Sequence, residues 1–120
     1  MAHVLVIEDS SFQRKIISTV LEENGHEVTL AKNGKEGLGL AEAARPDLII
    51  SDLLMPETDG FQVLETLMQK ELRIPAIILT SDIQKTTLNR CKSLGAAAVL
   101  NKPVNRDEVL AAVNEILTGP

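Results

Sequence analysis

The feature that most constrains the fold is an alternation, repeated five times, of a short apolar run with a longer amphipathic segment. The apolar runs have the length of buried strands, and the segments between them have helical spacing of apolar residues. The predicted strands are 4–7, 26–30, 47–51, 76–79 and 97–100. The predicted helices are 10–24, 34–44, 60–70, a fourth that ends at 94, and 105–117. This alternation predicts an α/β domain with a parallel sheet.

The number of units decides between the two common arrangements of such a sheet. Near-continuous apolar strands indicate a sheet that helices cover on both faces. Five units are too few to close the usual barrel of eight, so an open, doubly wound sheet follows. Neither linker nor repeat divides the chain, so we expect residues 1–120 to form one domain. Ligands of such sheets bind beyond the carboxyl ends of the strands.

Composition excludes several classes of function. A net charge of −5 argues against direct binding of nucleic acid. The absence of Trp and Tyr removes the usual platforms for a base or a flavin ring. No apolar run is long enough to span a membrane, and no signal peptide is visible. With Cys91 as its only cysteine, the chain suits a reducing compartment, and we expect a cytoplasmic protein.

The residues with reactive or metal-binding side chains lie at the ends of the predicted strands. They are Glu8 and Asp9 after the first strand, Asp52 after the third, Thr80 after the fourth and Lys102 after the fifth. Carboxylates that are crowded together repel one another and favour a hard divalent cation, Mg²⁺ or Mn²⁺. A lysine and a hydroxyl at the same edge can donate to a phosphoryl group. The set predicts phosphoryl transfer with a carboxylate as the nucleophile.

Each of these residues also has an ordinary explanation. Glu8 and Asp9 suit the first turn of a helix, where acidic groups favour the helix dipole. Thr80 is a normal strand or capping residue, and Lys102 is a normal loop lysine. The metal and phosphoryl hypothesis therefore depends on the set and on no single member.

Four motifs in register make the whole chain resemble a receiver domain of the two-component response regulators. They are the acidic pair in VLVIEDS, the stretch LIISDLLMPETDG, the LTS of the fourth strand and NKP after the fifth. The resemblance implies a flavodoxin-like or CheY-like (βα)5 fold with strand order 2-1-3-4-5. It also implies a phosphorelay switch whose partners are a sensor histidine kinase or a histidine phosphotransfer protein. A downstream protein target or a fused output domain would then read the switch.

The resemblance assigns a role to each matching position. Asp52 is the expected phosphoacceptor, and Thr80 and Lys102 are expected to bind the phosphoryl oxygens. The expected ligands of Mg²⁺ are Asp9, Asp52, the backbone carbonyl of Leu54 and, through water, Glu8. The Lys102–Pro103 peptide is expected to be cis. The helix 4–strand 5–helix 5 face is expected to change partners. The resemblance thus implies a switch rather than a metabolic enzyme.

The chain departs from the commonest family pattern at two positions. The acidic pair is Glu8–Asp9 instead of two aspartates, and the longer Glu8 can still reach a metal-bound water. Val99 stands where the family usually has Tyr or Phe, whose ring turns inward during the switch. A switch in this chain must then rely on Thr80 and the loop and helix that follow it.

Three other functions could be built on the same fold. A flavodoxin-like cofactor binder lacks support, because two carboxylates stand where its phosphate loop would be. A phosphatase would need a second aspartate at position 54, which is Leu54. A receiver-like interaction module that is never phosphorylated remains as the alternative, because of Val99.

The remaining features favour structural roles. Gly37 and Gly39 do not complete a dinucleotide fingerprint and predict a loosely packed second helix. Arg14 and Lys15 are interpreted as a solvated face. Phe12 either ends the buried stripe of the first helix or stands exposed beside the site, where it would help to dock a phosphodonor.

Overall fold

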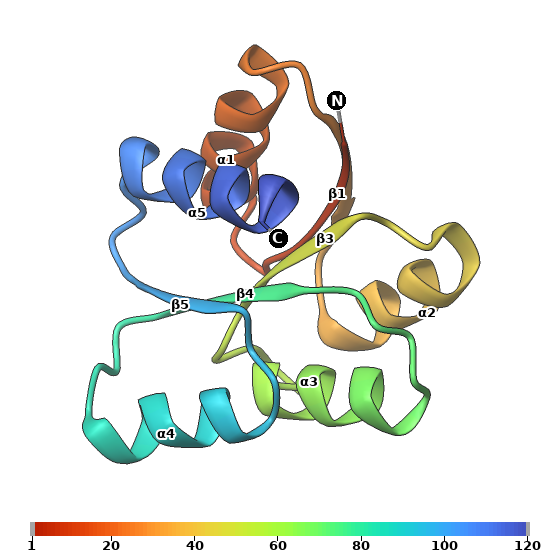
Figure 1. Ribbon diagram of the computed structural model, residues 1–120, viewed down its shortest axis with the longest axis vertical. Coiled ribbons are helices and arrows are strands. Elements are labelled where there is room, and N and C mark those ends of the chain that lie inside the picture. Colours follow the sequence, from red (N-terminus) through yellow and green to blue (C-terminus); the bar gives the residue numbers. More distant parts are fainter. Residues whose placement is uncertain (1, 120) are drawn as a thin grey trace.

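The computed structural model describes residues 2–119 and forms one open sheet of five parallel strands in the order β2-β1-β3-β4-β5. Figure 1 shows the sheet edge-on between two layers of helices. The predicted fold class and strand order are therefore confirmed. The strands are β1 (His3–Ile7), β2 (Glu27–Ala31), β3 (Leu48–Asp52), β4 (Ala76–Thr80) and β5 (Ala98–Asn101). The helices are α1 (Ser11–Glu23), α2 (Gly34–Ala44), α3 (Gly60–Gln69), α4 (Lys85–Ser93) and α5 (Arg106–Thr118).

The predicted elements lie within a few residues of the observed ones, and the differences place the site. The third, fourth and fifth strands each extend further than predicted, so Asp52, Thr80 and Asn101 are the last residues of their strands. Backbone pairing causes the extension, because Asp52 pairs with Leu79 and Thr80 pairs with Asn101 in the parallel ladder. The strand ends therefore fix the backbone of two predicted site residues.

Two apolar clusters fill the space between the sheet and its helices. Alternate side chains of each strand point to opposite faces of the sheet, as the strand geometry requires. Leu5 and Ile49 belong to the cluster beneath α2, α3 and α4. Val6 and Ile50 belong to the cluster beneath α1 and α5. In Figure 1 the same division is visible, with α1 and α5 on one side of the sheet and the other three helices opposite.

Helix α2 is packed against the sheet more closely than the sequence predicts. Gly37 is buried, and a Cβ atom at this position would overlap the side chain of Ile7 in β1. Gly39 lies on the outer side of the same helix with no atom close to the position of a Cβ. The prediction of a loosely packed second helix is therefore wrong, because Gly37 marks a close approach between helix and strand.

Four of the five helices begin with a side-chain cap. Ser10, Asn33, Asp59 and Asn105 each accept a hydrogen bond from a backbone N–H of the first turn. At α3, Gln62 completes a capping box by accepting from the backbone N–H of Asp59 at 2.8 Å. The N-cap of α4, Gln84, makes no such bond. None of the helices in residues 2–119 has both the length and the apolar character needed to cross a membrane.

Candidate functional site

The carboxyl ends of β1, β3 and β5 bring together side chains that the sequence singled out. Glu8 directly follows β1, Asp52 ends β3, and Lys102 follows β5. One carboxylate oxygen from each of Glu8, Asp9 and Asp52 can be chosen such that all three lie within 4.8 Å of one another. Glu8 is fully buried and Asp52 is 5% exposed, whereas Asp9 is exposed. The cluster is therefore largely buried and meets solvent at Asp9, and the group formed by Glu8, Asp9, Asp52 and Lys102 is called the acidic pocket below.

Lys102 supplies the positive charge of this pocket. Its Nζ lies 2.8 Å from Oδ1 of Asp52 and 3.2 Å from Oε1 of Glu8. The backbone N–H of Lys102 donates to the carbonyl of Thr80, which continues the pairing of β4 with β5 and holds the lysine at the edge. The Lys102–Pro103 peptide is cis, as expected. One lysine thus bridges carboxylates from two different strand ends.

Electrostatics in the pocket favour the uptake of positive charge. Burial, and next the charge of Asp52, raises the pKa of Glu8 to about 7 although Lys102 opposes the shift. Burial lowers the pKa of Lys102, but the hydrogen bond and charge of Asp52, together with Glu8, raise it above its ordinary value. Lys102 is therefore a permanent cation near neutral pH, and it does not fully compensate the carboxylates.

The donor set fits a hard divalent cation. The second carboxylate oxygen of Glu8, Oε2, is buried and has no hydrogen-bond partner among the described residues. A buried, unpartnered carboxylate oxygen is costly unless water or a cation reaches it. Mg²⁺ prefers oxygen ligands and retains several waters, which suits a pocket open at Asp9. The cluster therefore has the oxygen ligands that the resemblance to receiver domains leads us to expect around Mg²⁺.

Arg14 also belongs to the site, although the sequence pattern placed it on a solvent-exposed face of the first helix. Its guanidinium Nη1 donates to the backbone carbonyl of Glu8 at 2.7 Å and to that of Asp9 at 3.2 Å. Arg14 therefore holds the backbone that carries the acidic pair. The available signal was its place one turn after the cap Ser10, since helical side chains point back towards the N-terminus.

The loop after β3 is held close to Asp52 by Gly60. The N–H of Gly60 donates to the carbonyl of Leu53 at 2.7 Å. A Cβ atom at Gly60 would lie only 2.9 Å from the carbonyl oxygen of Asp52 and from Cα of Leu53. The chain therefore needs a glycine where α3 begins, because the helix start lies against the backbone of the acidic strand end. Leu54 lies within this loop with its side chain 71% exposed.

Thr80 lies at the end of β4, the strand next to β3, and is 2% exposed. Its hydroxyl oxygen accepts a hydrogen bond from the backbone N–H of Asp82 at 3.0 Å. Val99 in β5 is partly buried and packs against the cluster under α2, α3 and α4. Thr80 is thus hydrogen-bonded to the loop that leads to α4. At the position where the family usually has an aromatic ring, the aliphatic side chain of Val99 packs against the core.

Three exposed apolar side chains follow the strand ends that carry the site. Phe12 is 69% exposed, so it does not continue the buried stripe of the first helix and the alternative of an exposed side chain holds. Ile83 is 57% exposed. Phe12 lies in the first turn of α1 just after Asp9, Leu54 follows Asp52 in the next loop, and Ile83 follows Thr80. Large exposed apolar side chains beside a polar pocket are typical of a docking surface.

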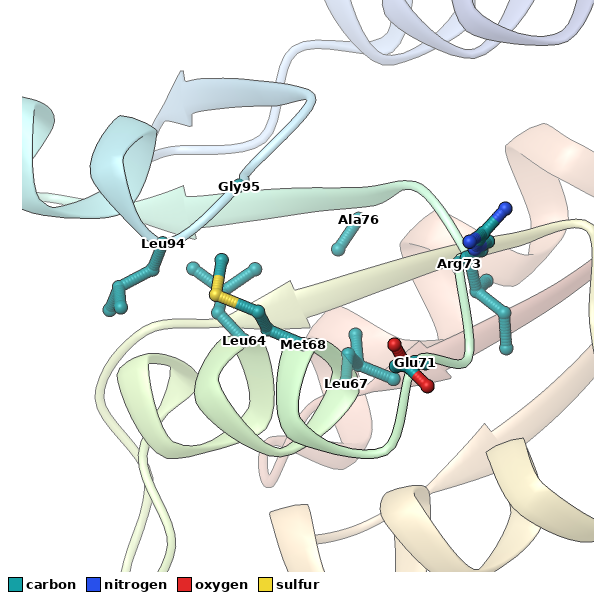
Figure 2. Close-up of a pocket in the computed structure, with 9 residues that line it drawn as sticks. Leu64, Leu67, Met68, Glu71, Arg73, Ala76, Leu94 and Gly95 are labelled. Atoms are coloured by element: carbon teal, nitrogen blue, oxygen red, sulfur yellow. The ribbon is translucent and has the colours of Figure 1, made fainter.

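Figure 2 shows a cavity of about 270 Å³ together with the side chains that line it. It lies between α3 and the turn that joins α4 to β5, with Leu64, Met68 and Leu94 among its walls. None of its lining residues belongs to the acidic pocket. This cavity is therefore separate from the acidic cluster at the carboxyl edge of the sheet.

Comparisons with known proteins agree with this arrangement. The model of the response regulator receiver domain matches residues 4–114. Protein PilH of Pseudomonas aeruginosa is 36% identical, over 99% of this chain and 100% of its own length. The alkaline phosphatase synthesis transcriptional regulatory protein PhoP of Bacillus subtilis is 34% identical over 95% of this chain. The matched region spans 48% of the length of PhoP.

Solved structures give the same result. The chemotaxis protein CheY4 of Vibrio cholerae superimposes with a TM-score of 0.91 at 33% identity, over 97% of this chain and 98% of its own. The receiver domain of the Francisella response regulator 1452 gives a TM-score of 0.93 at 33% identity, covering 97% and 96% of the two chains. With a family match over nearly its whole length, this protein belongs to the response regulator receiver domain family, the signalling switches of two-component systems.

Proposed function

We propose that residues 1–120 act as one receiver domain that accepts a phosphoryl group on Asp52 in a Mg²⁺-dependent reaction. The observation that carries the proposal is the buried Asp52 carboxylate with Lys102 Nζ at 2.8 Å and the acidic pair beside it. A buried aspartate in this position has both a cation to orient it and a site for a metal. The donor is a phosphohistidine of a sensor kinase or phosphotransfer protein.

The reaction is an attack by a carboxylate oxygen of Asp52 on the phosphorus of the donor. The new O–P bond forms as the P–N bond to the imidazole breaks, and the electron pair remains on the imidazole nitrogen, which takes a proton from water. Lys102 lies within reach of the phosphoryl oxygens because it already bonds to Asp52. Thr80 can donate its hydroxyl hydrogen to the same group. Catalysis then consists of positioning and charge neutralisation.

Asp9, Asp52 and the Leu54 carbonyl would hold Mg²⁺, with Glu8 acting through a bound water. The ion supplies positive charge that offsets the repulsion between carboxylates and phosphoryl oxygens. Arg14 keeps the carbonyls of Glu8 and Asp9 in place, which orients the acidic side chains. Burial of Asp52 excludes most water from the acceptor oxygen.

Phosphorylation would shift the population of the switch towards a second state and change the partners of the α4–β5–α5 face. A downstream protein or a fused output domain would bind this face. We also propose that the exposed Phe12 docks the phosphodonor beside the pocket. The chain assists its own phosphorylation and dephosphorylation but transforms no metabolite.

The test is intact-mass measurement after incubation with acetyl phosphate and Mg²⁺. One phosphoryl adduct is expected on the wild-type protein, and none on Asp52→Asn or with EDTA. Asp47→Asn is the matched control, because Asp47 is exposed and lies before β3, at the opposite end of the same strand. This variant is expected to take the adduct like the wild type.

Absence of an adduct on folded wild-type protein, with acetyl phosphate and with a phosphorylated histidine donor, would overturn the proposal. The alternative, an interaction module that is never phosphorylated, would then be favoured. Val99 is the specific observation that supports this alternative, because it removes the aromatic ring of the usual switch.

A further inference from the structure

The cavity in Figure 2 lies where the apolar cluster beneath α2, α3 and α4 reaches the surface of the molecule. Three of its lining residues, Leu64, Leu67 and Ala76, are buried members of that cluster. Met68, on the same helix α3, also lines the cavity and is 53% exposed. An apolar cavity that continues the core and exposes a large apolar side chain is a candidate binding site.

The cavity is open because α4 and the turn after it do not fill the space beside α3. Helix α4 ends at Ser93 and buries only Cys91. The chain then turns into β5 at Gly95, whose φ is +91°. A Cβ atom on Gly95 would lie 3.6 Å from Cε of Met68, so the backbone of this turn approaches α3 without a side chain. The short helix and the glycine turn therefore leave room for another molecule.

Two charged residues line the cavity after the end of α3. Glu71 and Arg73 both have left-handed backbone, with φ of 52° and 55°. This conformation is unfavourable for residues other than glycine, and such strain is concentrated at functional sites. Neither side chain forms an ion pair within residues 2–119. In Figure 2 their charged groups lie at the opposite end of the cavity from Leu94, so the cavity has an apolar end and a polar end.

The volume and the lining residues restrict the class of ligand. A cavity of about 270 Å³ is smaller than the usual site of a nucleotide or a drug-sized molecule, whereas an apolar cavity of about 150 Å³ already holds benzene. The opposite charges of Glu71 and Arg73 favour a neutral ligand, because a net charge would be repelled by one of them. The thioether of Met68 and a guanidinium group both interact favourably with aromatic rings. A carboxylate forms a strong hydrogen bond with an N–H or O–H donor.

We propose that this cavity binds a small neutral molecule with two fused aromatic rings and one N–H or O–H donor. The rings occupy the apolar end, beside Met68 and Leu94, and the donor is directed to the carboxylate of Glu71. The cavity lies at the amino end of β4, whereas Asp52 and Thr80 lie at the carboxyl ends of their strands. Binding therefore requires neither Mg²⁺ nor phosphorylation, and it is a property beyond the receiver function.

The first experiment is an NMR titration of the unphosphorylated protein with indole. Saturable shifts are expected at the amides of Ala76, Leu94 and Ala96, with a Kd of about 0.1–1 mM for a ligand of about nine non-hydrogen atoms. 1-Methylindole retains the rings without the donor and is expected to bind about three- to tenfold more weakly. Absence of saturable shifts at these amides, or equal Kd values for the two compounds, would overturn the proposal.

Glu71→Met tests the polar end of the cavity. Glu71 is exposed, and methionine has a similar length but no carboxylate. The variant is expected to bind indole only as tightly as 1-methylindole and to leave the Kd of 1-methylindole unchanged. Glu22→Met is the matched control, because Glu22 is an exposed glutamate on α1 that does not line the cavity. Equal Kd values for indole in the two variants would contradict the role of Glu71.

Met68→Trp tests the apolar end, because it offers the cavity an indole ring from the chain itself. The protein has no tryptophan, so the fluorescence of this variant reports the new ring alone. Its emission is expected to be shifted to shorter wavelength and protected from iodide quenching, and added indole is expected no longer to bind.

Leu30→Trp is the matched control, since Leu30 is 42% exposed on β2. It is expected to show the emission of a solvated ring and to bind indole like the wild type. Circular dichroism establishes that both variants are folded. Emission and quenching in folded Met68→Trp that equal those of Leu30→Trp would show that the cavity does not accept an aromatic ring. If Met68→Trp does not fold, the comparison of Glu71→Met with Glu22→Met decides the proposal.

Discussion

The carboxyl edge of the sheet and the two apolar layers between the sheet and its helices differ in the kind of side chain that they bury. In the layers, the buried side chains are apolar, as at Val6 and Ile50, and their removal from water stabilises the fold. At the edge, the buried side chains include Glu8, Asp52 and Thr80, and burial there raises the free energy of the charged groups. The free energy gained by burying the apolar layers therefore holds the polar site together, because burial of the site residues alone would be unfavourable.

The largest expected change in the free energy of unfolding comes from a substitution in an apolar layer that leaves the site residues unchanged. Leu21 of α1 is fully buried in the cluster beneath α1 and α5. Leu21→Ala is expected to lower the free energy of unfolding by about 2–5 kcal/mol, because it removes buried methyl groups and leaves a cavity. Denaturant titration measures this loss, and the adduct per folded molecule with acetyl phosphate is expected to stay at the wild-type level.

Leu30→Ala is the matched control for this prediction. Leu30 is 42% exposed on the edge strand β2, and its replacement is expected to change the free energy of unfolding by less than about 1 kcal/mol. Equal losses for the two leucines would contradict the distinction between layer and surface.

A substitution at the carboxyl edge, at Glu8, is expected to have the opposite effect and to raise the free energy of unfolding. The folded protein raises the pKa of Glu8 to about 7, against an ordinary value of 4.5 for a glutamate in water. Between these values the folded state binds more protons than the unfolded state, so the free energy of unfolding falls as the pH rises through this window. Above pH 7 the whole cost of burying the charge is present.

Glu8→Gln removes this cost. In EDTA at pH 8 it is expected to raise the free energy of unfolding by about 1–3 kcal/mol, at the rate of about 1.4 kcal/mol per unit of pKa. The gain is expected to shrink as the pH falls from 7 to 4.5, and Mg²⁺ at pH 8 is expected to reduce it by stabilising the wild type. Denaturant titrations at several pH values measure it. A gain independent of pH would show that the charge is not its cause.

The last comparison is between two glycines of α2, one of which has the smallest expected effect. Gly37→Ala is expected to lower the free energy of unfolding by about 1–3 kcal/mol, because the new methyl group would overlap Ile7 in the core. Gly39→Ala is expected to raise it by about 0.5–1 kcal/mol, because alanine favours the helix and this position is open. Thermal and denaturant unfolding of both variants measure the difference. Effects of the same sign would show that α2 is not in close contact with β1.

Much of the fold followed from local patterns. Short apolar runs between amphipathic segments predicted the parallel sheet, since each pattern reports the surroundings of its own residues. The carboxyl-edge rule then predicted that Glu8, Asp52 and Lys102 would lie together, and the structure places Lys102 against both carboxylates. The roles of these residues in phosphoryl transfer and metal binding remain predictions.

Other residues of the site could not be found in this way. Arg14 has the composition of a solvated helix face, yet its guanidinium is directed to the carbonyls of Glu8 and Asp9. Asp82 looks like an ordinary loop acid until its bonds to Thr87 and to the hydroxyl of Thr80 are seen. These contacts depend on rotamers and on the path of a loop, which no periodicity records.

The sequence by itself determined the order of strands and helices and the chemical types at the strand ends, because hydrophobic periodicity and chain punctuation are local properties. Only the tertiary structure decided how deeply Glu8 is buried, that Phe12 is exposed, and that Gly37 contacts Ile7. The physical reason is that burial, pKa and close packing depend on distances between residues far apart in the chain, and these are fixed only when the layers close around the sheet.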